Sequence, residues 1–187
     1  MDILEAIYQR RAVRNYTDQT VSPENLGKLI DAAIQAPTGW DGQFWAFGVI
    51  QGKSRLQDYS DRAKAFFFET YSPGHDPHSE RREMLRNPDY NLFYNAGTLV
   101  TIYSKPGGQF NSIDCCLAAE NFMLAACSMG LGTCPIGFSQ SWLDQTEIKE
   151  EMGVPSQYTA VLPMIIGYPA GTSERVPRLQ PEIYCGS

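Results

Sequence analysis

The chain has few of the side chains that hydrolytic and metal-dependent enzymes use for their chemistry. It contains two histidines among 187 residues, and both His75 and His78 lie in the turn-rich segment 73–78. Two histidines without a third clustered ligand make a poor metal site, so we interpret them as part of a solvated loop. The dinucleotide glycine motif, the phosphate-binding loop, the Gly-x-Ser-x-Gly elbow and the His-Glu-x-x-His helix are all missing. Hydrolytic catalysis therefore lacks its usual signs.

Paired cysteines are missing as well. The chain has five cysteines, none of them in a Cys-x-x-Cys motif, and Cys115 and Cys116 are adjacent. An odd number that includes an adjacent pair suits neither a disulfide framework nor a zinc site. Cys116 and Cys127 fall on an apolar predicted helix, where we expect buried, unreactive thiols.

Positive charge is in short supply, and so are long apolar runs. The formal net charge of −6 argues against nucleic acid or an anionic membrane surface as the main partner. No basic segment followed by an apolar one opens the chain, and glycines and a proline interrupt its longest uncharged stretch, so a cytoplasmic location is expected. A length of 187 residues with 43% hydrophobic content fits a single globular domain, 1–187.

Hydrophobic periodicity predicts helices alternating with apolar strands. The strands are expected at 44–50, 98–103 and 158–166, and the helices at 2–10, 22–36, 56–71, 79–86, 113–129 and 142–152. Caps are predicted at Asp2, Ser22 and Ser112, with Gly130 closing the 113–129 helix.

Two of these regions have unusual composition. The helix 113–129 is apolar on nearly all sides, which predicts burial between the sheet and a second subunit. The segment 53–91 is polar, aromatic and charged, which is typical of a lid or an outer helical layer. Its aromatic residues 66–68 and 71 either roof a pocket or pack in the core.

An arginine cluster follows the first predicted helix. Arg10, Arg11 and Arg14 place three guanidinium groups within five positions of an otherwise acidic chain. Because the planar guanidinium fork donates two parallel hydrogen bonds and stays charged, such a cluster is suited to holding phosphate. The alternative is that these arginines only complement the negative end of the helix dipole.

Three further segments have the composition of ligand-binding loops. The segment 36–45 is a polar loop with glycines and two indoles, and in 130–137 the glycines allow backbone N–H groups to approach a ligand. The tail adds Arg175 and Arg178. Taken singly, these segments are also explained as a helix stop, a C-cap with a tight turn, and solvated charges.

Taken together and in order, the segments resemble the FMN-dependent nitroreductase family. That family opens with a helix running into R-R-S-x-R-x-[FY], then has A-P-S-x-x-N-x-Q-P-W before its first core strand. A buried A-x-x-N-x-x-L-A-A-x-x-x-G-L-G-T helix and turn follows, and a G-x-P-A close precedes basic residues. The corresponding segments here are 7–16, 36–47, 114–137 and 166–182, and 53–91 is the most divergent part.

The resemblance implies an α+β fold with a central, mostly antiparallel sheet flanked by helices. It also implies a C-terminal arm exchanged in an intertwined homodimer, with FMN bound at the interface. The implied reaction passes a hydride from NADH or NADPH through flavin N5 to a nitroaromatic, a quinone or a related small acceptor. A flavin-using oxidase or dehydrogenase, a flavin-fragmenting enzyme and a non-catalytic flavin- or nucleotide-binding protein stay open as alternatives.

The resemblance also assigns cofactor-binding residues by position. Arg10, Arg11 and Arg14 would hold the phosphate and ribityl chain, with Arg178 and Arg175 closing on the phosphate. The other implied contacts are Pro37, Thr38, Gly39 and Asp41, which approach from the partner subunit, and Pro135, Ile136 and Gly137, which line the ring with a backbone N–H near N5. No side chain is assigned a catalytic role, because the flavin carries the chemistry.

Three positions depart from the family pattern. Ala12 replaces the usual Ser, so one hydroxyl contact to the flavin is lost, and Phe44 replaces a Pro, which alters the rigidity of its loop. Asp41 replaces an Asn. An ionised carboxylate beside the pyrimidine edge disfavours negative charge on the reduced ring, so we expect a lower flavin potential. If Asp41 is buried and protonated, it instead donates a hydrogen bond as Asn does.

Overall fold

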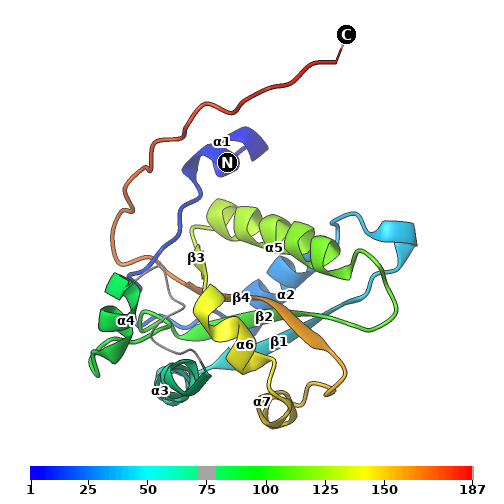
Figure 1. The fold of residues 1–187 in the computed structure, drawn as a ribbon. Coiled ribbons are helices and arrows are strands. Elements are labelled where there is room, and N and C mark those ends of the chain that lie inside the picture. Colours follow the sequence, from blue (N-terminus) through cyan, green and yellow to red (C-terminus); the bar gives the residue numbers. More distant parts are fainter. Residues whose placement is uncertain (71–78, 187) are drawn as a thin grey trace.

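A four-stranded antiparallel sheet forms the centre of the protein (Figure 1). The computed structural model describes residues 1–70 and 79–186. The strand order is β1-β2-β4-β3, with bounds β1 Trp45–Gln51, β2 Thr98–Ser104, β3 Gly132–Pro135 and β4 Thr159–Gly167. All three strand pairings are antiparallel. The expected α+β architecture is confirmed.

Helices cover both faces of this sheet and enclose two hydrophobic cores. α2 (Pro23–Ala33) and α5 (Asn111–Ser128) pack with Val100 and Ile102 of β2 on one face. α3 (Lys53–Thr70), α6 (Gln140–Leu143) and α7 (Thr146–Glu151) pack with Leu99 and Tyr103 on the other. Because neighbouring strand residues point to opposite faces, the fully apolar strand β2 supplies both cores.

The two N-terminal helices begin as their sequences predict. In α1 (Ile3–Gln9) the Asp2 carboxylate accepts a hydrogen bond from the Glu5 N–H at 2.8 Å. In α2 the Ser22 hydroxyl accepts from the Asn25 N–H at 3.2 Å. Each contact satisfies a donor that a helix start would otherwise leave unpaired.

The long helix α5 differs from expectation at its start. It begins at Asn111 without a side-chain cap, so the predicted cap Ser112 is wrong; the Asn111 amide instead donates to the Lys105 carbonyl. Its end is as predicted, with Gly130 at φ +74°. Ile113 and Leu117 are 59% and 42% exposed, so the sheet side of the helix is buried as expected, and its cover by a second subunit stays a prediction.

The cysteine predictions also need correction on this helix. Cys116 is exposed and Cys127 is half-buried, whereas Cys115 is fully buried. Burial raises the pKa of Cys115 to about 12. Cys116 is exposed because its position on the helix turns it toward the same uncovered face as Ile113 and Leu117.

The predicted helix 142–152 is broken into α6 and α7, because polar groups hold the chain at the break. The Asp144 carboxylate accepts from the Ala160 N–H at 2.8 Å and lies 3.3 Å from the ammonium group of Lys149. Lys149 is 5% exposed and also donates to the carbonyls of Ser156 and Tyr158, each at 2.8 Å. These bonds fix α7 against the start of β4.

The segment 53–91 contains α3 and α4 (Ser79–Arg86). α3 belongs to the outer helical layer, and its Phe67 is buried in the core beside Phe138, with ring centroids 5.6 Å apart. Tyr71, His75 and His78 lie outside the described residues, so the roles expected of them stay predictions, as does that of a lid.

The C-terminal tail is extended and leaves the body of the protomer (Figure 1). Leu179, Ile183 and Tyr184 are 95%, 79% and 87% exposed. Among the described helices, none combines the length and apolar composition needed to cross a membrane.

Candidate functional site

The arginine cluster lies on a segment that is tied to the sheet, which we name the arginine strap (residues 10–17). Ala12 forms a parallel bridge with Thr133 of β3, and the Val13 N–H donates to the Thr133 carbonyl at 2.9 Å. Further along, the Thr17 N–H donates to Tyr168, and Asn15 accepts from the Ala170 N–H at 3.0 Å. The strap therefore runs beside the edge strand β3 and the exit of β4.

Two glycines allow the strap to lie this close. A Cβ on Gly132 would be 2.5 Å from the side chain of Val13, and one on Gly167 would be 2.8 Å from the ring of Tyr16. Gly132 begins β3 and makes room for the protein's own strap, and it also lines the first pocket, so its expected approach to a ligand stays a prediction. Gly130, at φ +74°, follows the C-cap Met129 and ends α5, as the alternative interpretation described.

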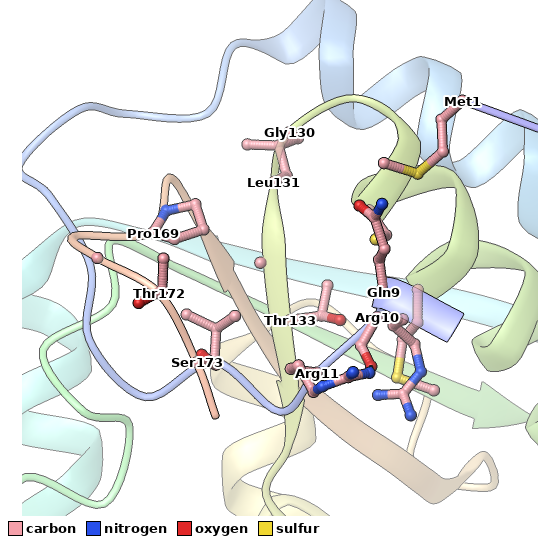
Figure 2. A pocket seen from close by; sticks show the side chains of 15 residues that line it. Met1, Gln9, Arg10, Arg11, Gly130, Leu131, Thr133, Pro169, Thr172 and Ser173 are labelled. Carbon is pink, nitrogen blue, oxygen red and sulfur yellow. The ribbon is translucent and has the colours of Figure 1, made fainter. Parts of the chain in front are cut away.

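The first pocket has a volume of about 410 Å³ and lies beside the strap. Figure 2 shows Arg10, Arg11 and Thr133 close together at β3, with Thr172 and Ser173 reaching the pocket from the start of the tail. Its other lining residues are Met1, Gln9, Val13, Met123, Cys127, Gly130, Leu131, Gly132, Pro169 and Gly171. Two guanidinium groups and three hydroxyl groups are a donor set that suits phosphate.

The two arginines of this pocket have different contacts in the protomer. Arg11 donates to the carbonyls of Tyr8 and Arg10, each at 2.7 Å, so the helix-end interpretation describes its present position. Arg10 instead lies with its Nε 3.6 Å from the Glu120 carboxylate of α5. Its terminal nitrogens keep their donors for a ligand.

A second pocket has a volume of about 270 Å³. Val13 and Thr133 line the first pocket, and the residues that follow them, Arg14 and Cys134, line the second. The structure brings Arg14 together with the predicted residues Pro135, Ile136 and Gly137; the remaining lining residues are Met84, Tyr90, Leu92, Tyr94 and Phe138.

The backbone of 135–137 leaves one N–H for a ligand. Pro135 has no N–H, and the Ile136 N–H donates to the Pro163 carbonyl at 2.9 Å. Gly137 is exposed, and a Cβ placed on it would meet nothing within 4 Å. Of the three residues, Gly137 is therefore the one positioned to donate a backbone hydrogen bond into the second pocket.

Two tyrosines of this pocket were not identified from the sequence. The Arg14 guanidinium lies 5.7 Å from the ring centroid of Tyr94, and the rings of Tyr90 and Tyr94 meet edge to face at 5.8 Å. Burial, together with the neighbouring Tyr94 hydroxyl, raises the pKa of Tyr90. Burial likewise raises the pKa of Cys134, against an opposing effect of Arg14. The aromatic run at 90–94 was the only sequence signal for this wall.

The predicted loop residues lie away from both pockets within one protomer. The Gly39 N–H donates to both carboxylate oxygens of Asp114, near the start of α5, at 3.2 Å. The first pocket contacts Met123 and Cys127 near the end of that helix. At 1.5 Å per residue, Asp114 and Cys127 are separated by about 20 Å along the axis. Pro37, Thr38 and Asp41 share this distant position with Gly39 (Figure 1).

The tail arginines are likewise outside the pockets of their own protomer. Arg175 and Arg178 are exposed in the extended tail, although Thr172 and Ser173 immediately before them line the first pocket. Among residues 1–70 and 79–186, no three His, Cys, Asp or Glu side chains gather as a metal site would require.

Comparison with known proteins identifies the family. The model of the nitroreductase family matches residues 7–168, so the chain belongs to the nitroreductase family. The resemblance seen in the sequence is thereby confirmed, and with it the oxidoreductase class.

Solved relatives share the fold over nearly the whole chain. A nitroreductase with bound FMN from Bacteroides fragilis has a TM-score of 0.81 at 27% identity, covering 96% of this chain and 95% of its own. Another from Desulfitobacterium hafniense, also with bound FMN, has a TM-score of 0.81 at 26% identity and full coverage of both chains. An FMN reductase [NAD(P)H] from Bacillus subtilis is 26% identical, covering 97% of this chain and 71% of the relative.

Proposed function

We propose that the protein is an FMN-dependent oxidoreductase that takes a hydride from NADH or NADPH and passes it to a small acceptor such as a nitroaromatic or a quinone. One observation supports this most directly: a single strap supplies Arg10 and Arg11 to one pocket and Arg14 to a second, which also contains Pro135 and Gly137. A phosphorylated, ring-bearing cofactor needs this pairing of an anion site with a flat, partly apolar site.

The residues present fit FMN. Arg10 and Arg11, with the hydroxyl groups of Thr133, Thr172 and Ser173, would hold the phosphate in the first pocket. For Arg11 this requires its guanidinium to leave the carbonyls of Tyr8 and Arg10. The ring would lie against 135–137 in the second pocket, within reach of the Arg14 guanidinium. Ala12 contributes its backbone, paired to Thr133, and no hydroxyl.

Bound FMN supplies the chemistry, accepting and donating a hydride at N5. The protein would orient the flavin ring and adjust its midpoint potential. Gly137 would donate its backbone N–H to the ring edge, and Arg14 would add positive charge that stabilises electron density on the ring. A proton needed by the reduced acceptor can come from water.

The site needs a second copy of the chain to be complete. The loop 37–41 cannot reach the pockets of its own protomer, and Trp40 at its tip is 93% exposed. The uncovered faces of α1 and α5 and the extended tail offer apolar surface for a partner, including Ile3, Leu4 and Ile113. We propose a homodimer in which the loop and the tail of one protomer, with Arg175 and Arg178, approach the pockets of the other.

The proposal is tested with the purified protein. We expect it to carry FMN, and we expect NADH or NADPH to bleach the flavin absorbance anaerobically, with recovery when a nitroaromatic or quinone is added. A protein that carries flavin but is never bleached is a binding protein. Bleaching followed by recovery with oxygen alone favours an oxidase, and conversion of the flavin to a new product identifies a fragmenting enzyme.

A double variant tests the strap. Arg10→Ala with Arg14→Ala should weaken FMN retention strongly, since each charge-assisted bond contributes roughly 1.5–3 kcal/mol. Lys28→Ala, which removes an exposed cation of α2, is the matched control and should retain FMN. If the double variant kept as much FMN as the parent, these arginines would not hold the cofactor, and the interpretation that they only complement the helix dipole would stand.

The dimer is tested by dilution. Sedimentation should show a dimer, and FMN release on dilution should follow the appearance of monomer, because the loop and the tail of the partner are lost together. FMN that stays bound to a monomer contradicts the shared site.

A further inference from the structure

Tyr90, Leu92 and Tyr94 form one wall of the second pocket, and the segment 90–96 that carries them contains an unusual backbone. Tyr94 and Asn95 have φ values of +51° and +55°. Asn adopts the left-handed region readily, but for a bulky residue such as Tyr it is costly. A strained backbone of this kind persists only where the surrounding contacts stabilise it.

The helix α3 anchors this wall from behind. The ammonium group of Lys64 donates to the Tyr90 carbonyl at 2.8 Å, and the Ser60 hydroxyl accepts from the Leu92 N–H at 2.8 Å. The Asn91 amide donates to the Gln57 side chain at 2.6 Å. Lys64 is 7% and Ser60 0% exposed. The backbone of the wall just before Tyr94 is therefore fixed by these bonds to α3.

Tyr94 directs its ring at Arg14. The guanidinium carbon is 5.7 Å from the ring centroid, within the range of a cation–π contact. Tyr90 supports the ring from the side, edge to face at 5.8 Å and an interplanar angle of 90°. Among the described residues, no carboxylate forms an ion pair with Arg14.

The kind of contact determines what Arg14 can still do. A carboxylate partner would use the N–H donors of the guanidinium and offset its charge. An aromatic face contacts the guanidinium through its π-electrons, so the five in-plane donors and the charge stay available to a ligand. Arg14 is thus oriented without being neutralised.

We propose that Tyr94 is a positioning residue that holds the Arg14 guanidinium in the second pocket, ready to meet the electron-rich edge of a ring ligand. This inference rests on the proposed function in taking that ligand to be FMN. The strained backbone at Tyr94 is then the cost of placing the ring, and the bonds from α3 keep it in place.

Two substitutions with the same backbone cost provide the test. Tyr94→Leu removes the aromatic face, and Tyr94→Phe keeps it. With apoprotein, we expect Leu to weaken FMN binding about 2- to 5-fold, the range for losing one partly exposed cation–π contact, while Phe stays near the parent value. The midpoint potential of bound FMN should fall in the Leu variant and stay unchanged in the Phe variant, because a displaced guanidinium no longer stabilises the reduced ring.

A double-mutant cycle then separates positioning from general packing. In an Arg14→Ala background, Tyr94→Leu should have no further effect on FMN binding, because Tyr94 acts through Arg14. Fully additive losses would overturn the proposal, as would a Phe variant that behaves like Leu.

A flavin-independent measurement keeps this inference separate from the proposed function. In the apoprotein, the NMR signals of the Arg14 side chain should be shifted upfield by the ring of Tyr94, in the parent and in Tyr94→Phe, and should return to ordinary positions in Tyr94→Leu. If the parent does not bind FMN, the proposed function fails while this shift still decides whether Tyr94 holds Arg14. Signals at ordinary positions in the parent would overturn the inference.

Discussion

At the scale of single residues, Asp41 is the departure from the family pattern with the largest expected effect on chemistry. It is exposed at φ +53°, in a loop whose Gly39 is tied to Asp114. Asp and Asn both tolerate this left-handed backbone. Exchanging one for the other therefore changes charge with little change in loop geometry.

We expect Asp41→Asn to raise the midpoint potential of bound FMN. The carboxylate of the partner's loop would oppose negative charge on the reduced ring, and the amide would not. Spectroelectrochemical titration of both proteins measures the effect, with equal thermal unfolding as the sign that the loop is unchanged. An unaltered or lowered potential would show that this carboxylate does not face the flavin.

Gly132 gives a second prediction at this scale. Gly132→Ala would place a Cβ 2.5 Å from Val13, so we expect a loss of about 1–3 kcal/mol in the free energy of unfolding. FMN retention should weaken as the strap is displaced. Gly27→Ala is the control, because Gly27 is exposed within α2 with nothing within 4 Å of the added Cβ; it should stabilise by roughly 0.5–1 kcal/mol.

Adding Val13→Ala to the Gly132 variant should restore only part of the loss, because it removes the two clashing Cγ atoms and leaves the Cβ, which would be 2.7 Å from the new methyl group. Denaturant unfolding of the parent, Gly27→Ala, Gly132→Ala and the variant with both Gly132→Ala and Val13→Ala measures these changes in stability. A Gly132 variant as stable as the parent would mean that the strap moves freely away from β3.

The sequence predicted those structural features that depend on residues only a few positions apart. The caps at Asp2 and Ser22 and the glycine C-cap at Gly130 follow from side-chain and backbone preferences within a few positions. The contact between Arg14 and Tyr94 joins residues 80 positions apart, so only the fold reveals it.

At the scale of elements, the sequence predicted strands that are long and apolar and missed the short one. β1, β2 and β4 fall within a residue or two of expectation. β3 has four residues, including a glycine and a proline, and such a segment reads as a turn. It is a strand because β4 pairs with it on one side and the strap follows its other edge.

The break between α6 and α7 was missed because helical periodicity does not encode it: the buried Lys149 ammonium group donates to carbonyls seven and nine residues further along the chain, and Asp144 accepts from the Ala160 N–H. Lys149→Met, which keeps the aliphatic stem, should destabilise the protein by about 2–4 kcal/mol, because three acceptors lose their charged donor inside the structure. Lys28→Ala removes an exposed pair and should cost less than about 1 kcal/mol.

Chemical denaturation of these two variants decides how much the buried lysine contributes. Similar losses for both would mean that α7 and the start of β4 are held mainly by apolar packing. In that case the interruption at Asp144 would need another explanation.

At the scale of the whole molecule, the proposed homodimer would make the protomer one part of a larger site. The first pocket lies near one end of α5, and the loop 37–41 lies near the other. A rotation that pairs two copies through their α5 faces would bring the loop of each to the pockets of the other. Such a pairing would also explain why helix 113–129 has the composition of a buried helix although one of its faces is uncovered in the protomer.

The buried tyrosines give the protein as a whole a sensitivity to alkaline pH. Burial raises the pKa of Tyr16, Tyr90 and Tyr103 above the ordinary value. Near pH 10 and above, the unfolded chain loses these phenolic protons while the folded chain keeps them. The native state then binds more protons than the unfolded state, so stability is complete below about pH 10 and declines as the pH rises further.

Tyr16→Phe isolates one contribution. The Tyr16 hydroxyl donates to the Val13 carbonyl at 2.6 Å inside the strap, so near neutral pH the variant should be less stable by about 1 kcal/mol. Between about pH 8 and about pH 11 its melting temperature should fall less than that of the parent, because one fewer buried phenol opposes ionisation. The difference in phenolate absorbance between the parent and Tyr16→Phe should rise together with unfolding of the parent, because the exposed tyrosines ionise equally in both. Parallel declines in the two proteins would mean that Tyr16 ionises without unfolding the strap, and the bond to Val13 would then not be what ties the arginines to β3.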